Sequence, residues 1–342
     1  MTYGAIIGCA TVATFLVALY VTGLVRRHAL RNSILDIPNA RSSHAAPTPR
    51  GGGVGIVLAF MGALVLLVFA GLLPFSLAFV LIAGGGAIAF TGYLDDRKAL
   101  PARIRICVHF AAATYAVISV GGISEPSLRM IGLHGAWAGG LLGVVVVTWS
   151  TNFFNFMDGI DGIAGSEAVF VAGAGALLNW KFGGDSGLTG VMLVLAAATS
   201  GFLVWNWPPA RIFMGDAGSG FLGFTLAVIG LAASRRSATP IEVWAILSGV
   251  FLVDATVTLL RRVARGDRWF EAHRLHAYQK LASRRGAHLP VTVLVISINL
   301  FWSLPWAWGA ASHPARATMF LFAALGPLAV IAYLAGAGHN RA

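Results

Sequence analysis

The sequence predicts an all-α, polytopic membrane protein with about eleven transmembrane helices (10–11), forming one transmembrane domain over residues 1–342. Of its 342 residues, 57% are hydrophobic and 11% are charged, whereas a soluble protein carries roughly 25% charged residues. The apolar runs are continuous and rich in Leu, Ala and Val, unlike the alternating strands of a membrane barrel. These two observations exclude a soluble globular chain and a disordered one.

Eleven apolar runs approach the roughly 20 residues that cross a hydrocarbon core of about 30 Å. In chain order they are 3–25, 52–73, 75–93, 104–120, 137–151, 165–180, 188–206, 218–234, 241–260, 290–309 and 316–336. The runs at 137–151 and 165–180 are short, so their ends are the least well defined. Only short loops remain between the runs.

Positive charge is divided unequally between the two sets of loops. With the N-terminus outside, five of the 24 Lys and Arg residues fall in outer loops, and the other 19 lie in or beside inner segments. This bias places the N-terminus outside. Arg26 and Arg27 follow the first run and no basic residue precedes it, so a retained helix is predicted rather than a cleaved signal. Topology and anionic membrane lipid explain the net charge of +11, and no nucleic-acid partner is expected.

Acidic residues indicate which face carries the chemistry. Nine of the thirteen lie on inner loops or at their helix ends, so a site on this face is predicted. Asp254 is interpreted as the one clear charge within a span, a buried partner of Arg261, Arg262 or a neighbouring helix. A secondary transporter would place polar groups near the midplane and show internal repeats, and the sequence shows neither.

Two adjacent carboxylates, Asp95 and Asp96, end the third run. They repel each other, and a cation or a shared proton relieves the repulsion. The alternative is a solvated loop in which basic neighbours pair with them. Those neighbours are Arg97, Lys98, Arg103 and Arg105.

A second motif, within 152–162, places Asn155, Asp158 and Asp161 three residues apart. In a helix they would share one face and present oxygen atoms to a hard cation or a polar ligand. The alternative is a helix N-terminus enriched in acidic residues.

A third motif joins Pro208 and Pro209, which stop a helix, to Asp216 at the start of the next one. Backbone N–H groups at such a start suit phosphate and a magnesium ion together. The alternative is that Asp216 is a simple N-cap.

Two inner loops combine basic residues with histidines. In the first, His44 precedes Arg50 and the glycine run 51–53, which could hold an anion or form a plain turn. In the second, His273 and His276 with Arg274 could grip a diphosphate or donate a proton. The alternative for the second loop is an amphipathic segment lying on lipid headgroups.

In their order and spacing, these motifs resemble the polyprenyl-phosphate N-acetylhexosamine-phosphate transferase family over almost the whole chain. The resemblance implies a helical bundle in the bacterial inner membrane with its active site facing the cytoplasm. It implies transfer of a sugar phosphate from a UDP-sugar donor to undecaprenyl phosphate, with release of UMP. The implied cofactor is Mg²⁺, with Mn²⁺ as an alternative, and a homodimer is a further expectation.

The same resemblance implies individual roles. Asp95 and Asp96 would act as catalytic residues at the acceptor phosphate, one of them as base. Asp216 would bind magnesium, with Asn155 as a further ligand. Asp161 would contact the uracil and Phe213 would stack on it. The implied substrate-binding residues are Asn155, Asp158, Asp161, Asn206, Phe213, Arg274, His276, Arg103, Arg50 and His44.

The strings at 41–44, 47–53 and 273–279 resemble the O-antigen-initiating branch, which uses 6-deoxy sugars such as N-acetylfucosamine or N-acetylquinovosamine. Ala277, Tyr278 and Gln279 stand where many members have Ile-His-His, and Arg103 stands where many have lysine. An intramembrane aspartyl protease would need Gly-x-Gly-Asp, but Phe213 occupies the first position. A CDP-alcohol phosphotransferase would have Ala-Arg soon after Asp-Gly, and this pair is absent. A secondary transporter of a polar or anionic solute remains the alternative.

Overall fold

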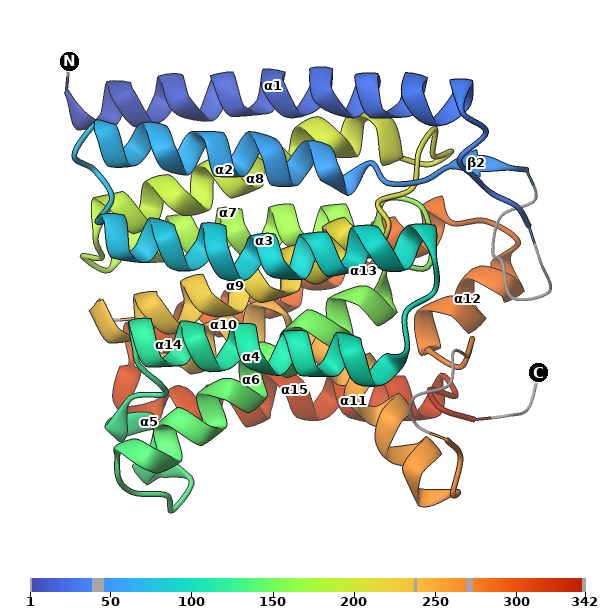
Figure 1. The fold of residues 1–342 in the computed structure, drawn as a ribbon. Coiled ribbons are helices and arrows are strands. Elements are labelled where there is room, and N and C mark those ends of the chain that lie inside the picture. The colour runs from blue at the N-terminus through green and yellow to red at the C-terminus, as the bar shows by residue number, and fades with distance from the viewer. Residues whose placement is uncertain (1, 39–45, 237–238, 269–272, 340–342) are drawn as a thin grey trace.

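The structure, a computed structural model, describes residues 2–38, 46–236, 239–268 and 273–339. Most of the long helices lie side by side with nearly parallel axes, whereas α6 and α11 are inclined to them, and α1 begins at the opposite end of the bundle from the end of α15 (Figure 1). The helices are α1 (Tyr3–Arg31), α2 (Gly53–Phe69), α3 (Phe75–Arg97), α4 (Ala102–Val120), α5 (Glu125–Met130), α6 (Ala136–Met157), α7 (Ile163–Lys181), α8 (Ser186–Asn206), α9 (Asp216–Arg236), α10 (Ile241–Leu247), α11 (Gly249–Ala264), α12 (Ala277–Arg285), α13 (Leu289–Ile298), η1 (Asn299–Ser303), α14 (Leu304–Ser312), η2 (Pro314–Arg316) and α15 (Ala317–Leu334).

The described residues contain one small sheet. Strands β1 (Leu35–Asp36) and β2 (Thr48–Pro49) pair antiparallel, with Leu35 opposite Pro49. This pair folds the connection between α1 and α2 back on itself at the end of the bundle.

The helical class predicted from the apolar runs is confirmed. Within the described residues, nine helical segments are long and apolar enough to cross a membrane, and α10 with α11 makes a tenth. The remaining predicted run corresponds to α2, whose 17 residues lie at the lower end of the spanning range. Every predicted run therefore has a helical counterpart.

Two of the predicted runs differ in detail from the structure. The run at 241–260 is a broken helix, because α10 and α11 meet at Ser248 with a bend of 79°. A Cβ atom on Gly249 would lie 2.9 Å from Leu325 Cδ2, so the bend packs tightly against α15. The run at 137–151 continues as α6 to Met157, because Phe153, Phe154 and Met157 pack into the core although Asn152 and Asn155 interrupt the apolar pattern.

Helix α9 is the centre of the bundle, since 89% of its most apolar window is buried. Two close approaches fix its first turn. A Cβ atom on Gly92 of α3 would collide with the backbone of Asp216 and Ala217, and one on Gly53 of α2 would collide with Gly218. Glycine at these positions lets the ends of α2 and α3 touch the start of α9.

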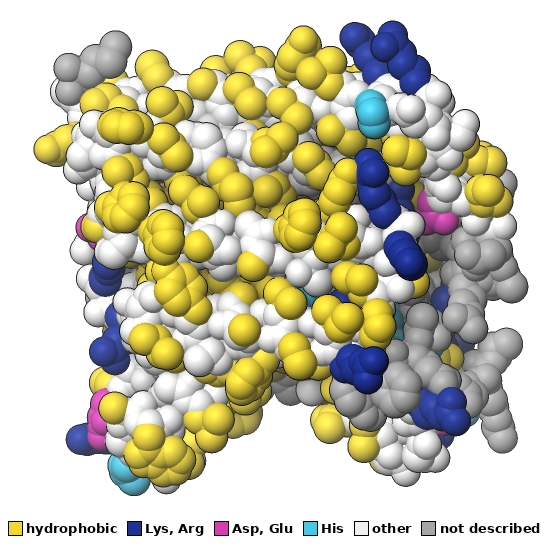
Figure 2. Space-filling view, viewed as in Figure 1, with side chains coloured by type: hydrophobic (Ala, Val, Ile, Leu, Met, Phe, Trp, Pro, Cys, Tyr) yellow, Lys and Arg dark blue, Asp and Glu magenta, His cyan; other side chains and the backbone are white. Residues whose placement is uncertain are grey.

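The outer surface fits a lipid environment. Hydrophobic side chains cover the flank of the bundle, while Lys and Arg gather mainly at the right-hand end in Figure 2. Phe90 is 62% exposed and Ile118 79%, and both lie on spanning helices. The interpretation of Asp254 as the one charge within a span is wrong, because Glu167 in α7 and Glu242 in α10 are also buried.

Candidate active site

A cavity of about 1060 Å³ lies at the end of the bundle where α3, α6 and α8 end and α4 and α9 begin. Most of the site residues predicted from the sequence line it. They are Arg50, Asp95, Arg103, Asn155, Asp158, Asp161, Asn206, Phe213, Asp216, Arg274 and His276. Asp96 does not line this cavity, but its carboxylate forms an ion pair with Arg50, which does. His44 lies outside the described residues.

Asp96 and Asp216 form the junction between α3 and α9. The Asp96 carboxylate accepts the backbone N–H of Asp216 at 3.0 Å and that of Ala217 at 3.4 Å. These N–H groups belong to the first turn of α9, where no intrahelical partner exists. Asp96 therefore caps α9 from a neighbouring helix, and the alternative of Asp216 as a simple N-cap is wrong.

Arg50 connects the same two carboxylates. Its Nη2 atom lies 2.8 Å from Asp96 Oδ1 and 2.8 Å from Asp216 Oδ1. Burial lowers the pKa of Arg50, but the negative charges of Asp96 and Asp216 outweigh burial and raise this pKa above its usual value. The guanidinium is therefore a fixed positive charge at the edge of the cavity.

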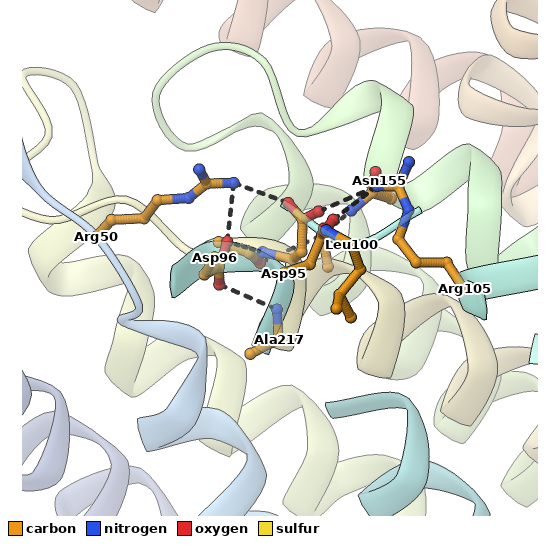
Figure 3. Close-up of polar contacts among 10 residues, drawn as sticks. Arg50, Asp95, Asp96, Leu100, Arg105, Asn155 and Ala217 are labelled. Carbon is orange, nitrogen blue, oxygen red and sulfur yellow. Dashed lines mark hydrogen bonds and ion pairs between the residues drawn. The ribbon is translucent and has the colours of Figure 1, made fainter. Parts of the chain in front are cut away.

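Asp95 has a separate set of partners. Its Oδ1 accepts the Leu100 N–H at 2.6 Å, and its Oδ2 lies 2.7 Å from Arg105 Nη1. The same Nη1 is 3.8 Å from Asp216 Oδ2. Arg50 and Arg105 thus approach the carboxylates from opposite sides (Figure 3).

The alternative of a solvated loop around the two aspartates is wrong, although one of its proposed pairs exists. Arg105 does pair with Asp95, but the side chains of Asp95 and Asp96 are only 8% and 9% exposed. Two arginines relieve the repulsion between these carboxylates inside the protein.

The predicted helical face of Asn155, Asp158 and Asp161 is wrong. Helix α6 ends at Met157, so Asp158 and Asp161 lie in the turn before α7, which Gly162 closes with a φ of +74°. All three side chains still line the cavity. Asn155 Nδ2 donates to Ser219 Oγ at 3.2 Å, which ties α6 to α9.

Asp158 is the carboxyl group with the most altered acidity outside the spans. Burial, and then the negative charge of Asp216, raise the pKa of Asp158 to about 7. This group can therefore gain or lose a proton near neutral pH, and a bound cation would favour its ionised form.

Asp161 is held by residues distant in sequence. Its Oδ2 accepts the Ala210 N–H at 2.9 Å, and its Oδ1 lies 3.1 Å from His288 Nδ1. Asn206 supports the same turn: its Oδ1 accepts the Gly162 N–H at 3.0 Å, and its Nδ2 donates to Ile212 O at 3.0 Å. Asn206 is 3% exposed and mainly fixes this part of the cavity wall.

Phe213 joins the cavity wall to strand β2 and to the start of α2. Its N–H donates to Pro49 O at 2.8 Å, and its carbonyl accepts the Gly52 N–H at 2.9 Å. The two predicted motifs around Arg50 and Asp216 are therefore physically continuous.

The histidine loop, residues 273–278, is attached through Asp254. The Asp254 carboxylate accepts the N–H groups of Ala277 at 2.9 Å and Tyr278 at 3.1 Å, and lies 3.4 Å from His276 Nδ1. The interpretation of Asp254 as a partner of Arg261 or Arg262 is therefore not borne out, whereas its pairing with a neighbouring helix is. Tyr278 Oη donates to Phe156 O at 3.0 Å, so the loop also rests on α6.

Sequence reasoning overlooked several residues that line or support the cavity. His109 lines it from α4, and its spacing of four residues from Arg105, which puts the two on one helical face, is a signal that could have found it. Gln279 also lines it, close to His273 and Arg274, which the sequence did single out. No local signal marked His288, whose partner Asp161 is 127 residues away.

The donor atoms suit a hard cation only in part. Within the described residues, no three His, Cys, Asp or Glu side chains lie together as a ready-made metal site. The cavity does offer oxygen donors from Asp95, Asp158, Asp216 and Asn155. Because Mg²⁺ is commonly held by one or two carboxylates together with substrate phosphates, this donor set fits Mg²⁺ once a diphosphate is bound.

The chain is similar in sequence to known proteins. The profile of glycosyl transferase family 4 matches residues 77–234. A decaprenyl-phosphate N-acetylglucosaminephosphotransferase of Mycobacterium tuberculosis is 30% identical over 340 residues, covering 87% of this chain and 80% of that protein. A probable undecaprenyl-phosphate N-acetylglucosaminyl 1-phosphate transferase of Bacillus subtilis is 28% identical over 300 residues, covering 86% and 82%.

A third relative, the undecaprenyl-phosphate alpha-N-acetylglucosaminyl 1-phosphate transferase of Escherichia coli K12, is 28% identical over 293 residues, covering 78% of this chain and 76% of that protein. The matched residues of this chain include the paired aspartates, the turn after α6 and the start of α9. The chain therefore belongs to glycosyl transferase family 4, the family of polyprenyl-phosphate N-acetylhexosamine-phosphate transferases.

Proposed function

We propose that this protein transfers an N-acetylhexosamine phosphate from a UDP-sugar to undecaprenyl phosphate. UMP is released, and the donor is a 6-deoxy sugar such as UDP-N-acetylfucosamine or UDP-N-acetylquinovosamine. The reaction is the first membrane step of O-antigen or another cell-surface polysaccharide. The observation that carries the proposal is the grouping of Asp95, Asp96 and Asp216 between Arg50 and Arg105 at one wide cavity.

The reaction brings two phosphorylated substrates together, and the charges of the cavity suit them. An oxygen of the acceptor phosphate attacks the phosphorus attached to the sugar, and the bond from that phosphorus to the oxygen of UMP breaks. Arg50 and Arg105 supply N–H donors to phosphate oxygens, while the protein orients both substrates. When bound, Mg²⁺ on Asp216 and Asn155 would neutralise the diphosphate and stabilise the departing UMP.

Of the two paired aspartates, Asp95 is assigned to the acceptor phosphate. Asp95 lines the cavity, whereas the carboxylate of Asp96 is directed to the first turn of α9. A phosphate monoester has a second pKa of about 6, so it is mostly dianionic at pH 7. Asp95 would therefore mainly position the acceptor and accept the proton of the minor monoanion.

The donor nucleotide is assigned to Asp161 and Phe213. Both residues line the cavity, and Asp161 is fixed by Ala210 and His288. A uracil stacked on Phe213 could donate its ring N–H to Asp161. The diphosphate would then extend toward Arg50 and Arg105.

The end of the bundle that carries the cavity is proposed to face the cytoplasm of a bacterial cell. The basic residues gather mainly at this end (Figure 2), and loops of high positive charge remain on the cytoplasmic side. The protein would therefore lie in the inner membrane with its N-terminus outside.

The test is UMP release by the purified chain in detergent. The assay contains undecaprenyl phosphate and one member of a panel of UDP-N-acetylhexosamines, with either Mg²⁺ or EDTA. Magnesium-dependent release with one donor would support the proposal and identify the sugar. If folded protein released no UMP with any donor, but reconstituted vesicles accumulated an anionic solute, the transporter alternative would replace it.

A further inference from the structure

A second cavity, here called the α1–α3 slot, lies next to the candidate active site and shares Arg50 with it. It measures about 340 Å³ and is bounded by the end of α1, the start of α2 and the end of α3. Its walls include Leu24 and Val25 of α1, Val54 of α2 and Tyr93 of α3. Leu24 is 42% exposed, so the slot borders a surface that faces lipid.

The slot has a basic end. His28, Arg50 and Arg97 line it and supply N–H groups, and Asp96 is its acidic residue. Asp96 is already engaged by Arg50 and by the first turn of α9. Arg97 is exposed and lies 4.6 Å from the centre of the Tyr93 ring, and within the described residues it pairs with no carboxylate. The slot therefore offers an apolar wall beside an uncompensated positive charge.

This combination matches an amphiphilic anion. Basic pockets between transmembrane helices near the cytoplasmic surface bind the headgroups of anionic lipids. We propose that the α1–α3 slot binds an anionic phospholipid, with its phosphate at Arg97 and His28 and an acyl chain along Leu24 and Val54. The positive end of the slot and its lipid-facing wall select this occupant over a soluble anion.

The acceptor lipid is a less suitable occupant. The Arg50–Asp96 ion pair stands between the slot and the larger cavity, where Asp95 and Asp216 are accessible. A phosphate in the slot would therefore meet the back of Arg50 and not the donor diphosphate. Because Arg50 lines both cavities, a lipid in the slot would influence how Arg50 divides its contacts between phosphate and the two aspartates.

The proposal predicts selective lipid binding that does not depend on turnover. Delipidated full-length protein in a neutral detergent is titrated with phosphatidylglycerol or phosphatidylcholine, and bound lipid is measured by native mass spectrometry. Phosphatidylglycerol should bind more tightly, and Arg97→Gln should weaken it about fivefold, the effect of losing one basic contact at a membrane surface. Leu24→Trp, which fills the apolar wall, should also weaken it. Arg31→Gln is the matched control, because Arg31 is exposed at the end of α1 and does not line the slot.

Two results would overturn the proposal. One is phosphatidylglycerol binding by folded Arg97→Gln and Leu24→Trp proteins that equals wild type. The other is a pair of findings that would make the slot the acceptor site. Equimolar undecaprenyl phosphate would displace phosphatidylglycerol, and Arg97→Gln would raise the KM for undecaprenyl phosphate by the same factor by which it weakens phosphatidylglycerol binding. The lipid-binding measurement tests the slot even if the protein does not catalyse the proposed transferase reaction. Only an effect of phosphatidylglycerol on UMP release would depend on that proposed function.

Discussion

The carboxylate of Asp96 accepts the backbone N–H of Asp216 at 3.0 Å, although 120 residues separate the two. Asp216 directs its own carboxylate to Arg50 and Arg105. Asp96 therefore caps the start of α9, and Asp216, which stands at that start, directs its negative charge to the cavity. Two acidic residues that look equivalent in sequence have different physical tasks.

Two variants of Asp96 should distinguish its role as the cap of α9 from its role as the charged partner of Arg50. Asp96→Ala removes the cap of α9 and should lower the free energy of unfolding by about 1 kcal/mol, the usual value of a lost helix cap. Asp96→Asn keeps an oxygen acceptor but loses the ion pair with Arg50. We expect the Asn variant to melt closer to wild type than the Ala variant, as measured by thermal unfolding in detergent. Equal melting temperatures for the two variants would contradict the capping role.

Replacing Asp216 should act mainly on turnover. Asp216→Asn removes the charge that lies between Arg50 and Arg105, together with the proposed magnesium ligand. UMP release should fall by about 10²–10³-fold, as when one preorganised electrostatic group is lost. The retention time on size-exclusion chromatography and the melting temperature serve as folding controls. Magnesium-dependent turnover within a few-fold of wild type would remove this assignment.

The raised pKa of Asp158 predicts how the stability of the folded protein depends on pH. Its pKa is raised to about 7 in the folded protein by burial and by Asp216, against about 3.9 for an unperturbed aspartate. Between these values the folded state binds more protons than the unfolded state, so the contribution of Asp158 to stability is present below about pH 4 and is lost as the pH rises to about 7.

Asp158→Asn cannot titrate and should flatten this part of the stability profile. The comparison uses thermal melts of wild type and variant in EDTA from pH 4.5 to pH 8, with the difference between the two curves as the measured quantity. The variant should gain stability relative to wild type as the pH rises. Parallel curves would show that Asp158 is ionised throughout this range.

Asp254 should control the histidine loop without touching substrate. Asp254→Ala removes the acceptor of the Ala277 and Tyr278 N–H groups, and hydrogen bonds to a charged group contribute about 1.5–3 kcal/mol each. We expect at least about tenfold faster amide exchange at Ala277 and Tyr278. The KM for the UDP-sugar should rise more than the KM for undecaprenyl phosphate. Thr258→Val, which removes only the hydroxyl donor to Asp254, is the milder control, and unchanged exchange in Asp254→Ala would refute the positioning role.

The sequence allowed prediction of the helical class because continuous apolar runs have few alternatives in a membrane. It also located Asp95, Asp96 and Asp216, since each stands at the polar end of an apolar run. Polar residues inside runs were harder to assign. Glu167 is fully buried and receives a hydrogen bond from Asn299 of the η1 segment, a contact between two helices that no local pattern encodes.

Predictions failed where the backbone departs from a regular helix. Asn155, Asp158 and Asp161 have helical spacing, but Gly162 takes a positive φ and the chain turns after Met157. The alignment of these residues at the cavity comes instead from long-range partners such as Ala210 and Ser219. A spacing of three residues therefore identified side chains that do line one cavity, but from a helical geometry that the structure does not have.

Phe213 and Asp161 give the most direct test of the donor nucleotide's position. Stacking of a base on an aromatic side chain contributes about 1–3 kcal/mol, so Phe213→Ala should weaken UDP-sugar binding by roughly five- to 150-fold. Phe213→Tyr retains the ring and should remain near wild type. Asp161→Asn should weaken UDP-sugar binding while leaving undecaprenyl phosphate binding almost unchanged, because the proposal assigns Asp161 to the uracil and Asp95 to the acceptor phosphate. Calorimetric titration of each variant with both substrates separates the two effects, and a larger loss for the lipid phosphate would place the nucleotide elsewhere in the cavity.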